Sequence, residues 1–320
     1  MLDSFSMLRL LAIFSVLLHY NLLAEVSSTR PNPPAITLQW GIYQGEVDEY
    51  DSQIIRFGDV RFGATPPRFN KPSSPAAVDA LTVQPDLGGV SCIQASISAL
   101  TNAPRGHRAM LSLGEQGRDY HSVLARHGLA ARSAYIFGRL SLLWGNYRLG
   151  AYGWLAGNYM QKSVQPNAGL YDQALLLDWV QQYICLFGGD NTKVSAWGES
   201  AGVGSVLHHL IREHGRVNPD FGTFAIQSPA FEWSWDNSAN GALDRIYQNF
   251  SELAGCGAAY DIDCLSQSNQ LKEANAQLVT DLYATGLFPL GPAVNGQWIS
   301  PIPDVSLTSA FNLYIKSPVY

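Results

Sequence analysis

The chain has 320 residues, a formal net charge of −6, 47% hydrophobic residues and 14% charged residues. This composition is typical of a globular protein and excludes a disordered or collagen-like chain. The acidic balance argues against a nucleic-acid partner, because nucleic-acid binding proteins normally carry a basic excess. A chain of this length can form one large domain, or two small ones, with a sizeable core.

The pattern of residues 1–28 predicts a secretory signal peptide. Arg9 precedes the apolar run LLAIFSVLL, and small residues follow the run. His19 and Asn21 interrupt it, so it falls short of the roughly 20 residues that span a bilayer, and we expect no transmembrane anchor. The alternative interpretation is an N-terminal helix of the core.

The cysteines agree with secretion. Cys256 and Cys264 bracket a short polar loop, and a disulfide between them would fit an oxidising, extracellular compartment. In that compartment Asn249, which begins the sequence Asn-Phe-Ser, is a candidate glycan acceptor.

Alternating apolar residues and glycine breaks in residues 41–69 predict an N-terminal set of antiparallel strands. Their apolar side chains are Ile42, Ile54, Ile55, Phe57, Val60 and Phe62. Residues 142–155 predict a buried strand that leads into a loop.

The next stretch alternates helices with strands. Residues 169–190 predict a helix that Gly188 and Gly189 stop, with apolar residues at helical spacing, namely Leu176, Trp179, Val180, Tyr183, Ile184 and Phe187. A strand over 193–197, a helix over 201–215 and a strand over 221–229 follow. The apolar face of the second helix holds Val203, Val206, Leu207, Leu210 and Ile211. This alternation predicts an α/β fold with a largely parallel sheet.

Residues 104–140 depart from the pattern. They hold six of the 15 arginines and three of the seven histidines, but no lysine. One interpretation is a basic patch for an acidic partner, and the other is translated sequence that does not belong to the fold.

The sequence GESAG at 198–202 fits the nucleophile elbow of serine hydrolases, in which a serine lies on a sharp turn between a strand and a helix. The five residues alone are a weak signal, but a predicted strand ends at Trp197 and a predicted helix begins at Ala201. The helix N-terminus directs N–H groups and a positive dipole end toward Ser200, which suits a developing oxyanion. We therefore predict Ser200 as the nucleophile and the Ala201 N–H as one oxyanion donor.

Three stretches of the chain resemble the type-B carboxylesterase/lipase family, the cholinesterase-like α/β-hydrolases, and in particular its secreted fungal members. They are VRFGATPPRF, NYRLGAYGWLAG and NAGLYDQALLLDWVQQYICLFGGDNTKVSAWGESAGVGSV, and the resemblance covers about residues 40–103 and 142–320. It implies an α/β-hydrolase fold, a mostly parallel sheet flanked by helices. It also implies hydrolysis of small-molecule or lipid esters through an acyl-enzyme on Ser200, with no metal or organic cofactor. In the family the residue before the serine, here Glu199, supports the hydrogen-bond network, and Cys256 pairs with Cys264.

The histidine and the acid of the family's triad have no match. Both follow the serine along the chain in α/β-hydrolases, but the last 106 residues contain no histidine. His208, His209 and His214 follow Ser200 in the same predicted helix or at its end. With a rise of about 1.5 Å per residue, His208 lies about 12 Å and His214 about 21 Å along the axis from the serine, so we expect surface or helix-end histidines.

Asp281 and Asp304 are the nearest carboxylates after the helix, and neither matches the family position of the acid. The glycine-rich oxyanion loop is also missing. Cys92 matches the family's early cysteine, yet only 53 residues separate it from Asn146, with no run of glycines and no companion cysteine. This leaves Cys92 unpaired, and Cys185 is predicted to be a buried helix residue.

The segment 104–140 falls inside this shortened interval. A frame-disrupted or mis-spliced reading explains the missing loop, the missing cysteine and the arginine excess together, whereas a basic patch explains only the last. We therefore expect residues 29–320 to form an incomplete α/β-hydrolase domain, truncated at its C-terminus, with weak or no esterase activity.

The alternative is a non-catalytic binding or adhesion protein on the same fold. Such a protein has no evident reason to retain Gly198, Glu199, Ser200 and Gly202 together, which favours descent from an active esterase.

Overall fold

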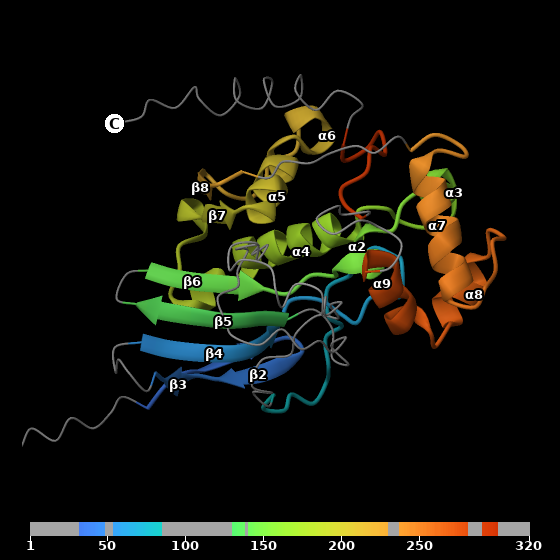
Figure 1. The fold of residues 1–320 in the computed structure, drawn as a ribbon. Helices are drawn as coiled ribbons and strands as arrows, with labels where there is room; N and C mark the ends of the chain where they lie inside the picture. Colours follow the sequence, from blue (N-terminus) through green and yellow to red (C-terminus); the bar gives the residue numbers. More distant parts are fainter. Residues whose placement is uncertain are drawn as a thin grey trace, which may run out of the picture. The chain divides into compact units, whose positions relative to one another are not determined.

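The computed structural model describes residues 32–48, 54–84, 130–137, 140–229, 237–280 and 290–299 (Figure 1). The chain divides into two compact units, Met1–Pro34 and Ala35–Tyr320, and all described helices and strands lie in the second. The predicted signal peptide and residues 101–129 lie outside the described residues. Over the ranges given above, no helix has the length and apolar character that crossing a membrane requires.

Antiparallel strands form the N-terminal part of the second unit, as predicted. β1 (Ala35–Leu38) pairs with β2 (Gly41–Gln44), and a separate sheet has the strand order β3–β4–β5–β6. Its strands are β3 (Glu46–Val47), β4 (Ile54–Arg61), β5 (Ala130–Phe137) and β6 (Leu140–Gly145). β5 belongs to the predicted anomalous segment 104–140, and its backbone pairs with β4 on one side and β6 on the other.

Helices and a parallel strand pair follow. In chain order these elements are α2 (Gly150–Trp154), α3 (Asn158–Ser163), α4 (Ala168–Tyr183), the 3-10 helices η2 (Ile184–Phe187) and η3 (Asn191–Lys193), β7 (Ser195–Glu199), α5 (Ala201–Leu210), α6 (Arg212–Gly215), β8 (Thr223–Gln227), α7 (Ala242–Leu253), α8 (Ile262–Gln267) and α9 (Leu271–Thr280). The predicted helix over 169–190 and the strands over 193–197 and 221–229 are confirmed, with ends that shift by a few residues. The predicted helix over 201–215 is regular only as α5, because Glu213 and His214 in α6 have left-handed φ and ψ values.

The predicted parallel character holds at one strand pair only. Among the described strands, β7 and β8 are parallel and every other pairing is antiparallel. Connection length explains the difference. Two residues join β5 to β6, which permits only a hairpin, whereas α5 and α6 lie between β7 and β8 and return the chain in the same direction.

Two observations correct the prediction of a buried strand and a loop over residues 142–155. In β6, Leu142 is exposed and Leu143 and Trp144 are half-buried, and helix α2 occupies part of the predicted loop. The glycines of this stretch indicated a loop, but two of them serve close packing. A Cβ on Gly153 would overlap the backbone of Arg148, and Gly150 adopts a φ of +55° directly against the side chain of Asn275. Asn275 in turn accepts a hydrogen bond from the Ala151 N–H at 2.7 Å.

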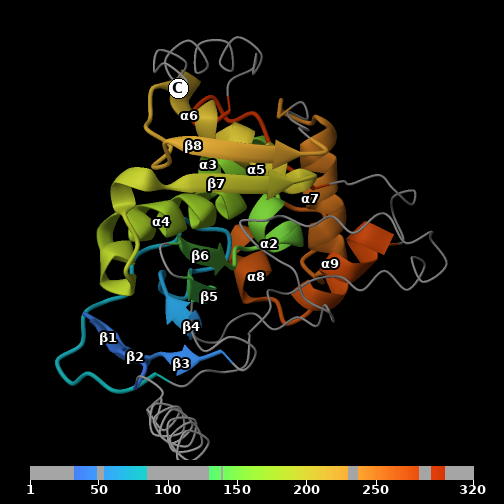
Figure 2. The same ribbon diagram turned by 90° about the vertical axis from the view of Figure 1, so that its left-hand side faces the viewer.

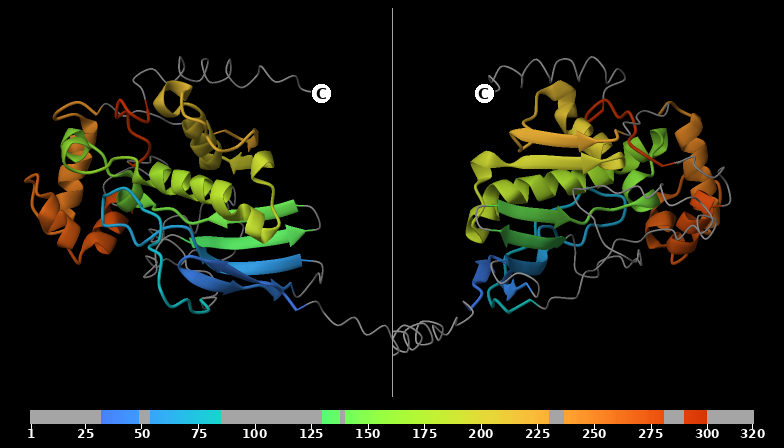
Figure 3. Two further views of the ribbon diagram at one scale, coloured as in Figure 1. Left: turned by 180° about the vertical axis from the view of Figure 1, so that it is seen from behind. Right: turned by 60° about the vertical axis from the view of Figure 1, so that its left-hand side comes forward.

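Helix α4 supports both groups of strands. Leu176, Trp179 and Val180 pack with buried residues of β4, whereas Leu177 packs with β7 and α5. Figures 2 and 3 show α4 between the β7–β8 pair and the strands β4–β6 in both views. One helix therefore sets how β7 lies relative to the N-terminal sheet.

The end of this helix contradicts the prediction that Cys185 is buried. Cys185 is exposed, as is Leu186, while Ile184 and Phe187 are buried. The helix tightens to 3-10 geometry at η2, where residues three apart share a face, so Ile184 and Phe187 point inward together and the two residues between them point out. Gly188, with a φ of 79°, then ends the helix as predicted.

A second core lies among the helices α2, α3, α7, α8 and α9. Its members include Tyr152, Met160, Tyr247, Phe250 and Leu265, and Figure 1 shows α7, α8 and α9 grouped together. The predicted disulfide between Cys256 and Cys264 is present and joins the loop after α7 to helix α8, with the two Cα atoms 5.9 Å apart.

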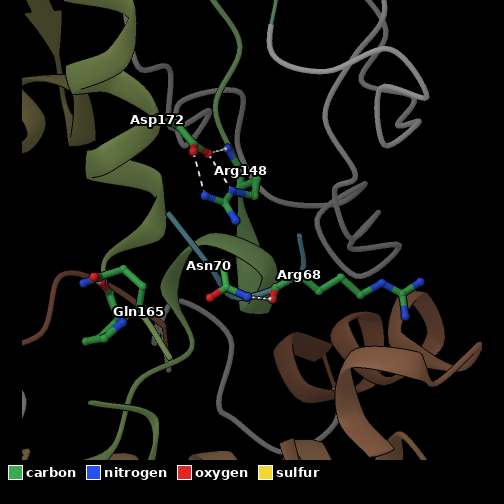
Figure 4. A network of polar contacts seen from close by, with 6 residues as sticks. Arg68, Asn70, Arg148, Gln165 and Asp172 are labelled. Carbon is green, nitrogen blue, oxygen red and sulfur yellow. Dashed lines mark hydrogen bonds and ion pairs between the residues drawn. The ribbon is translucent and has the colours of Figure 1, made fainter. Parts of the chain in front are cut away.

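A buried ion pair joins Arg148, in the connection between β6 and α2, to Asp172 of α4 (Figure 4). The Arg148 side chain donates two hydrogen bonds to the Asp172 carboxylate, at 2.8 and 2.7 Å, and its main-chain N–H donates a third at 2.9 Å. Burial raises the pKa of Asp172, and these hydrogen bonds oppose that rise. Because the pair is enclosed, each charge depends on the other for solvation.

We expect Asp172→Asn to lower the free energy of unfolding by about 3–5 kcal/mol, because it leaves the Arg148 guanidinium buried without its counter-charge. Urea denaturation measures the change. Glu46→Gln is the matched control, since the Glu46–Arg56 pair is largely exposed and should contribute at most about 1 kcal/mol. Equal losses in the two variants would contradict this account of the buried pair.

Candidate active site

Ser200 lies at the junction of β7 and α5 in a strained backbone conformation. Its φ of 54° and ψ of −120° fall outside the regions that residues with a Cβ normally adopt. Main-chain hydrogen bonds to β8 and α5 hold it there. Its N–H donates to the Gln227 carbonyl at the end of β8 at 3.1 Å, and its carbonyl accepts from Val203 in α5 at 3.0 Å. The predicted strand–serine–helix turn is therefore present.

Gly198 allows this turn because β7 and α5 approach each other at backbone distance. A Cβ on Gly198 would lie 2.5 Å from the carbonyl carbon and oxygen of Gly202 and 2.7 Å from the Val203 nitrogen. No backbone atom can yield that much space without moving the helix. The first glycine of GESAG is thus a packing requirement of this structure.

Glu199 and Ala201 flank the serine, and both are exposed. Glu199 is the last residue of β7 and lies opposite Gln227 in the parallel register. Ala201 is the first residue of α5, so its N–H is among those that have no acceptor within the helix. Alternation along β7 turns Ala196 and Gly198 toward α5, whereas Trp197, 64% exposed, and Glu199 face away from it.

The histidines of α5 correct the expectation of surface side chains. His208 and His209 are 1% and 2% exposed, and only His214 is exposed as predicted. Trp298 covers this end of the helix: its indole N–H donates to the His208 carbonyl at 2.9 Å, and its ring lies 5.3 Å from that of His209.

His209 has a structural partner rather than a catalytic one. Its Nε2 lies 3.1 Å from Oε1 of Gln173 in α4, and the amide nitrogen of Gln173 donates to the Ser205 hydroxyl at 3.1 Å. Burial, with smaller effects from the charges of Arg212 and His208, lowers the pKa of His209 to about 3. Across the described ranges no histidine hydrogen-bonds to Ser200, and His19, His107, His121 and His127 lie outside them.

Of the remaining candidate residues from the sequence, the structure describes Asn249 but not Cys92, Asp281 or Asp304. Asn249 lies on α7 with its side chain half-buried. Cys92, Asp281 and Asp304 lie outside the described residues. Within the described part of the chain, no cluster of three His, Cys, Asp or Glu side chains is arranged to hold a metal ion.

Sequence reasoning missed the polar contacts that fix α5 beside α4. Gln173 and Ser205 each lie within an apolar helical run, and a lone polar residue on an otherwise apolar face is the signal that indicates such a contact. No local pattern indicates which residue is its partner.

Known proteins similar to this chain are carboxylesterases and lipases. A sequence model of the carboxylesterase family matches residues 131–316. A secreted lipase of Arthroderma benhamiae is 39% identical over 162 residues, which are 51% of this chain and 30% of that protein. Carboxylesterase patB of Penicillium expansum is 38% identical over 160 residues, 49% of this chain and 28% of that protein. The chain thus spans less than a third of the length of these two relatives.

The fold is also that of solved esterases. The crystal structure of EstA from Aspergillus niger matches with a TM-score of 0.64 at 23% identity, over 89% of this chain and 58% of that one. At this identity the likeness concerns the fold, and it confirms the α/β-hydrolase architecture that the sequence predicts.

We expect Gly198→Ala to destabilise the chain by about 1–3 kcal/mol or more, because the added methyl group meets backbone on α5. Gly222→Ala is the control: a Cβ there has no atom within 4 Å, and the backbone has an ordinary φ. That substitution should be neutral or stabilise by up to about 1 kcal/mol. Urea denaturation compares the two variants, and a Gly198→Ala chain as stable as Gly222→Ala would exclude the close contact.

The pKa of His209 predicts a specific pH dependence of stability. Between its ordinary value of 6.5 and about 3, the unfolded chain binds a proton that the folded chain does not. Stability from this group therefore falls as the pH drops through this window, by about 1.4 kcal/mol per pH unit. Urea denaturation at several pH values should show that the free energy of unfolding of His209→Gln falls less steeply with decreasing pH, because this variant lacks the contribution of His209. Some pH dependence is left, because the other groups still titrate. If the free energy of unfolding fell equally steeply with decreasing pH in the original chain and in His209→Gln, the lowered pKa of His209 would be refuted.

Proposed function

Because this chain belongs to the carboxylesterase family, we propose that it descends from hydrolases of carboxylic esters and that Ser200 is the nucleophile of the elbow. The observation that carries the proposal is the backbone of Ser200, held in a strained conformation between a parallel strand and a helix. Strain of this kind costs stability, and in proteins it is concentrated at functional sites. The proposed substrates are small-molecule or lipid esters.

In the proposed reaction the Ser200 hydroxyl attacks the ester carbonyl and forms an acyl-enzyme, which water then hydrolyses. The negative charge of the tetrahedral intermediate develops beside the first turn of α5. There the Ala201 N–H and the positive end of the helix dipole would stabilise it. Glu199, exposed at the end of β7, would support the hydrogen bonds of the site. None of these steps uses a metal or an organic cofactor.

We further propose that these 320 residues lack an efficient base for Ser200. The last 106 residues contain no histidine, and the buried His209 forms a hydrogen bond with Gln173. A serine hydroxyl is a poor nucleophile until a base accepts its proton. Weak or absent turnover is therefore expected of the chain alone, and a non-catalytic binding role on the same fold is the alternative.

Secretion is part of the proposal. It is supported by the signal-like segment 1–28, by the Cys256–Cys264 disulfide, since disulfides form in oxidising compartments, and by the similarity to the secreted lipase of Arthroderma benhamiae. In the secretory pathway Asn249 would be open to glycosylation before α7 folds and buries Ser251.

A nucleophile that is placed but lacks a base should respond to a base added from solution. We expect imidazole to accelerate hydrolysis of a p-nitrophenyl ester by the purified chain beyond its effect in solution, and to accelerate labelling of Ser200 by a fluorophosphonate. Peptide mapping by mass spectrometry identifies the labelled residue.

Ser200→Ala is the matched control, because it removes the hydroxyl but keeps the Cβ and the turn. The difference between the two proteins isolates the contribution of Ser200. Rapid labelling of Ser200 without imidazole would show that a base is present, contrary to the proposal. No labelling at any imidazole concentration would favour the non-catalytic alternative.

A further inference from the structure

The sequence contains two Asn-Gly pairs, Asn240–Gly241 and Asn295–Gly296, and the structure describes both. An asparagine followed by glycine is the pair most open to spontaneous deamidation, because glycine has no side chain to hinder its main-chain nitrogen. We propose that Asn240 is a site of spontaneous conversion to aspartate and isoaspartate, and that the fold protects Asn295 from the same reaction.

The reaction needs only water and a trace of base. The main-chain nitrogen of Gly241 loses its proton and attacks Cγ of Asn240, so a C–N bond forms and the side-chain nitrogen leaves as ammonia. The product is a five-membered succinimide. Water then opens the ring at either carbonyl, which yields aspartate, or isoaspartate when the main chain continues through Cγ. One water is consumed, one ammonia is released, and nothing is oxidised or reduced.

The side chain of Asn240 is free to make this approach. Asn240 is exposed, in the turn that precedes α7, and within the described residues its side-chain amide makes no hydrogen bond. Its contacts come from the main chain: the N–H donates to Oδ2 of Asp244 at 2.8 Å, and the carbonyl accepts from Arg245 at 3.1 Å. Rotation of the amide toward Gly241 therefore breaks no contact of the side chain.

Asn295 differs at the side chain. It is 6% exposed, and its Oδ1 accepts hydrogen bonds from the main-chain N–H groups of Gln297, Trp298 and Ile299, at 3.2, 2.8 and 3.1 Å. The amide must give up these three bonds before Cγ can reach the Gly296 nitrogen. At roughly 1 kcal/mol per hydrogen bond, the reactive conformer becomes roughly a hundredfold rarer.

The main-chain nucleophiles do not explain the difference. The Gly241 N–H donates to the Ser238 carbonyl at 3.0 Å, and the Gly296 N–H donates to the Ile299 carbonyl at 3.1 Å. Both nitrogens are held by one similar hydrogen bond, so hydrogen bonding distinguishes the two sites at the asparagine side chains and not at the glycine nitrogens.

Conversion at Asn240 would weaken the contact between the first turn of α7 and helix α3. Asp244, which accepts from the Asn240 N–H, also accepts from the Tyr159 N–H of α3 at 3.3 Å, and is 3% exposed. Isoaspartate lengthens the main chain by one atom directly before this contact and adds a carboxylate near a buried one. The expected consequence is a weaker link between the first turn of α7 and α3.

The experiment compares the two sites in one protein. The full chain is incubated at mildly alkaline pH, folded in buffer or unfolded in urea, and peptides are mapped over time by mass spectrometry with fragmentation that separates aspartate from isoaspartate. In urea both sites should convert at similar rates. In the folded chain Asn240 should convert roughly a hundredfold faster than Asn295, as estimated from the three hydrogen bonds.

Gly241→Ala is the control for the chemistry. Gly241 has an ordinary φ of −70°, so alanine fits the turn, and its methyl group should slow conversion of Asn240 without changing Asn295. Equal rates at the two sites in the folded chain would overturn the proposal. So would an unmodified Asn240 in the folded chain after the urea sample has converted.

Discussion

The contact between Gly198 of β7 and Gly202 of α5 determines where Ser200 lies. Because the two backbones touch, the residue between them must take a conformation that costs about 1–3 kcal/mol in strain. The buried face of α5 offsets this cost, since Val203 and Val206 are fully buried and each contributes about 1.5–3 kcal/mol. The position of Ser200 therefore follows from packing and from main-chain hydrogen bonds, and does not require a partner for its hydroxyl.

Helix α4 transmits this arrangement to the rest of the second unit. Asp172 binds Arg148 in the connection between β6 and α2, and Gln173, the next residue, binds two successive turns of α5. Adjacent positions on a helix point about 100° apart, so one short stretch of α4 can hold neighbours on two sides. Enclosed polar contacts of this kind tolerate few alternative alignments, because an unsatisfied buried group is costly. They give α4 a defined rotation relative to both the N-terminal sheet and the elbow.

The features that could be predicted from the sequence are those that local periodicity controls. The apolar spacing of α4 and α5, the strand before Ser200 and the stop at Gly188 all follow from residues a few positions apart. Burial of His208 and His209 did not follow, because Trp298 covers them from 90 positions away. The exposure of Cys185 escaped prediction since the change from α to 3-10 geometry shifts its face by a fraction of a turn. The glycines of α2 suggested a loop for a related reason: whether a glycine serves flexibility or close packing depends on a neighbour that the local sequence does not identify.

The packing at the elbow also changes what the motif says about activity. Retention of GESAG favoured an active ancestor because a binding protein would have no reason to keep all four motif residues. The structure supplies a reason for one of them, since a Cβ on Gly198 would meet the backbone of α5 wherever β7 and α5 approach this closely, with or without catalysis. Glu199, Ser200 and Gly202 remain informative. Glu199 and Ser200 lie at the carboxyl end of β7, Glu199 is exposed, and neither fills the core, so packing alone would permit other residues at these positions. The case for a reactive serine thus depends on three of the four motif residues, and on whether a base reaches Ser200.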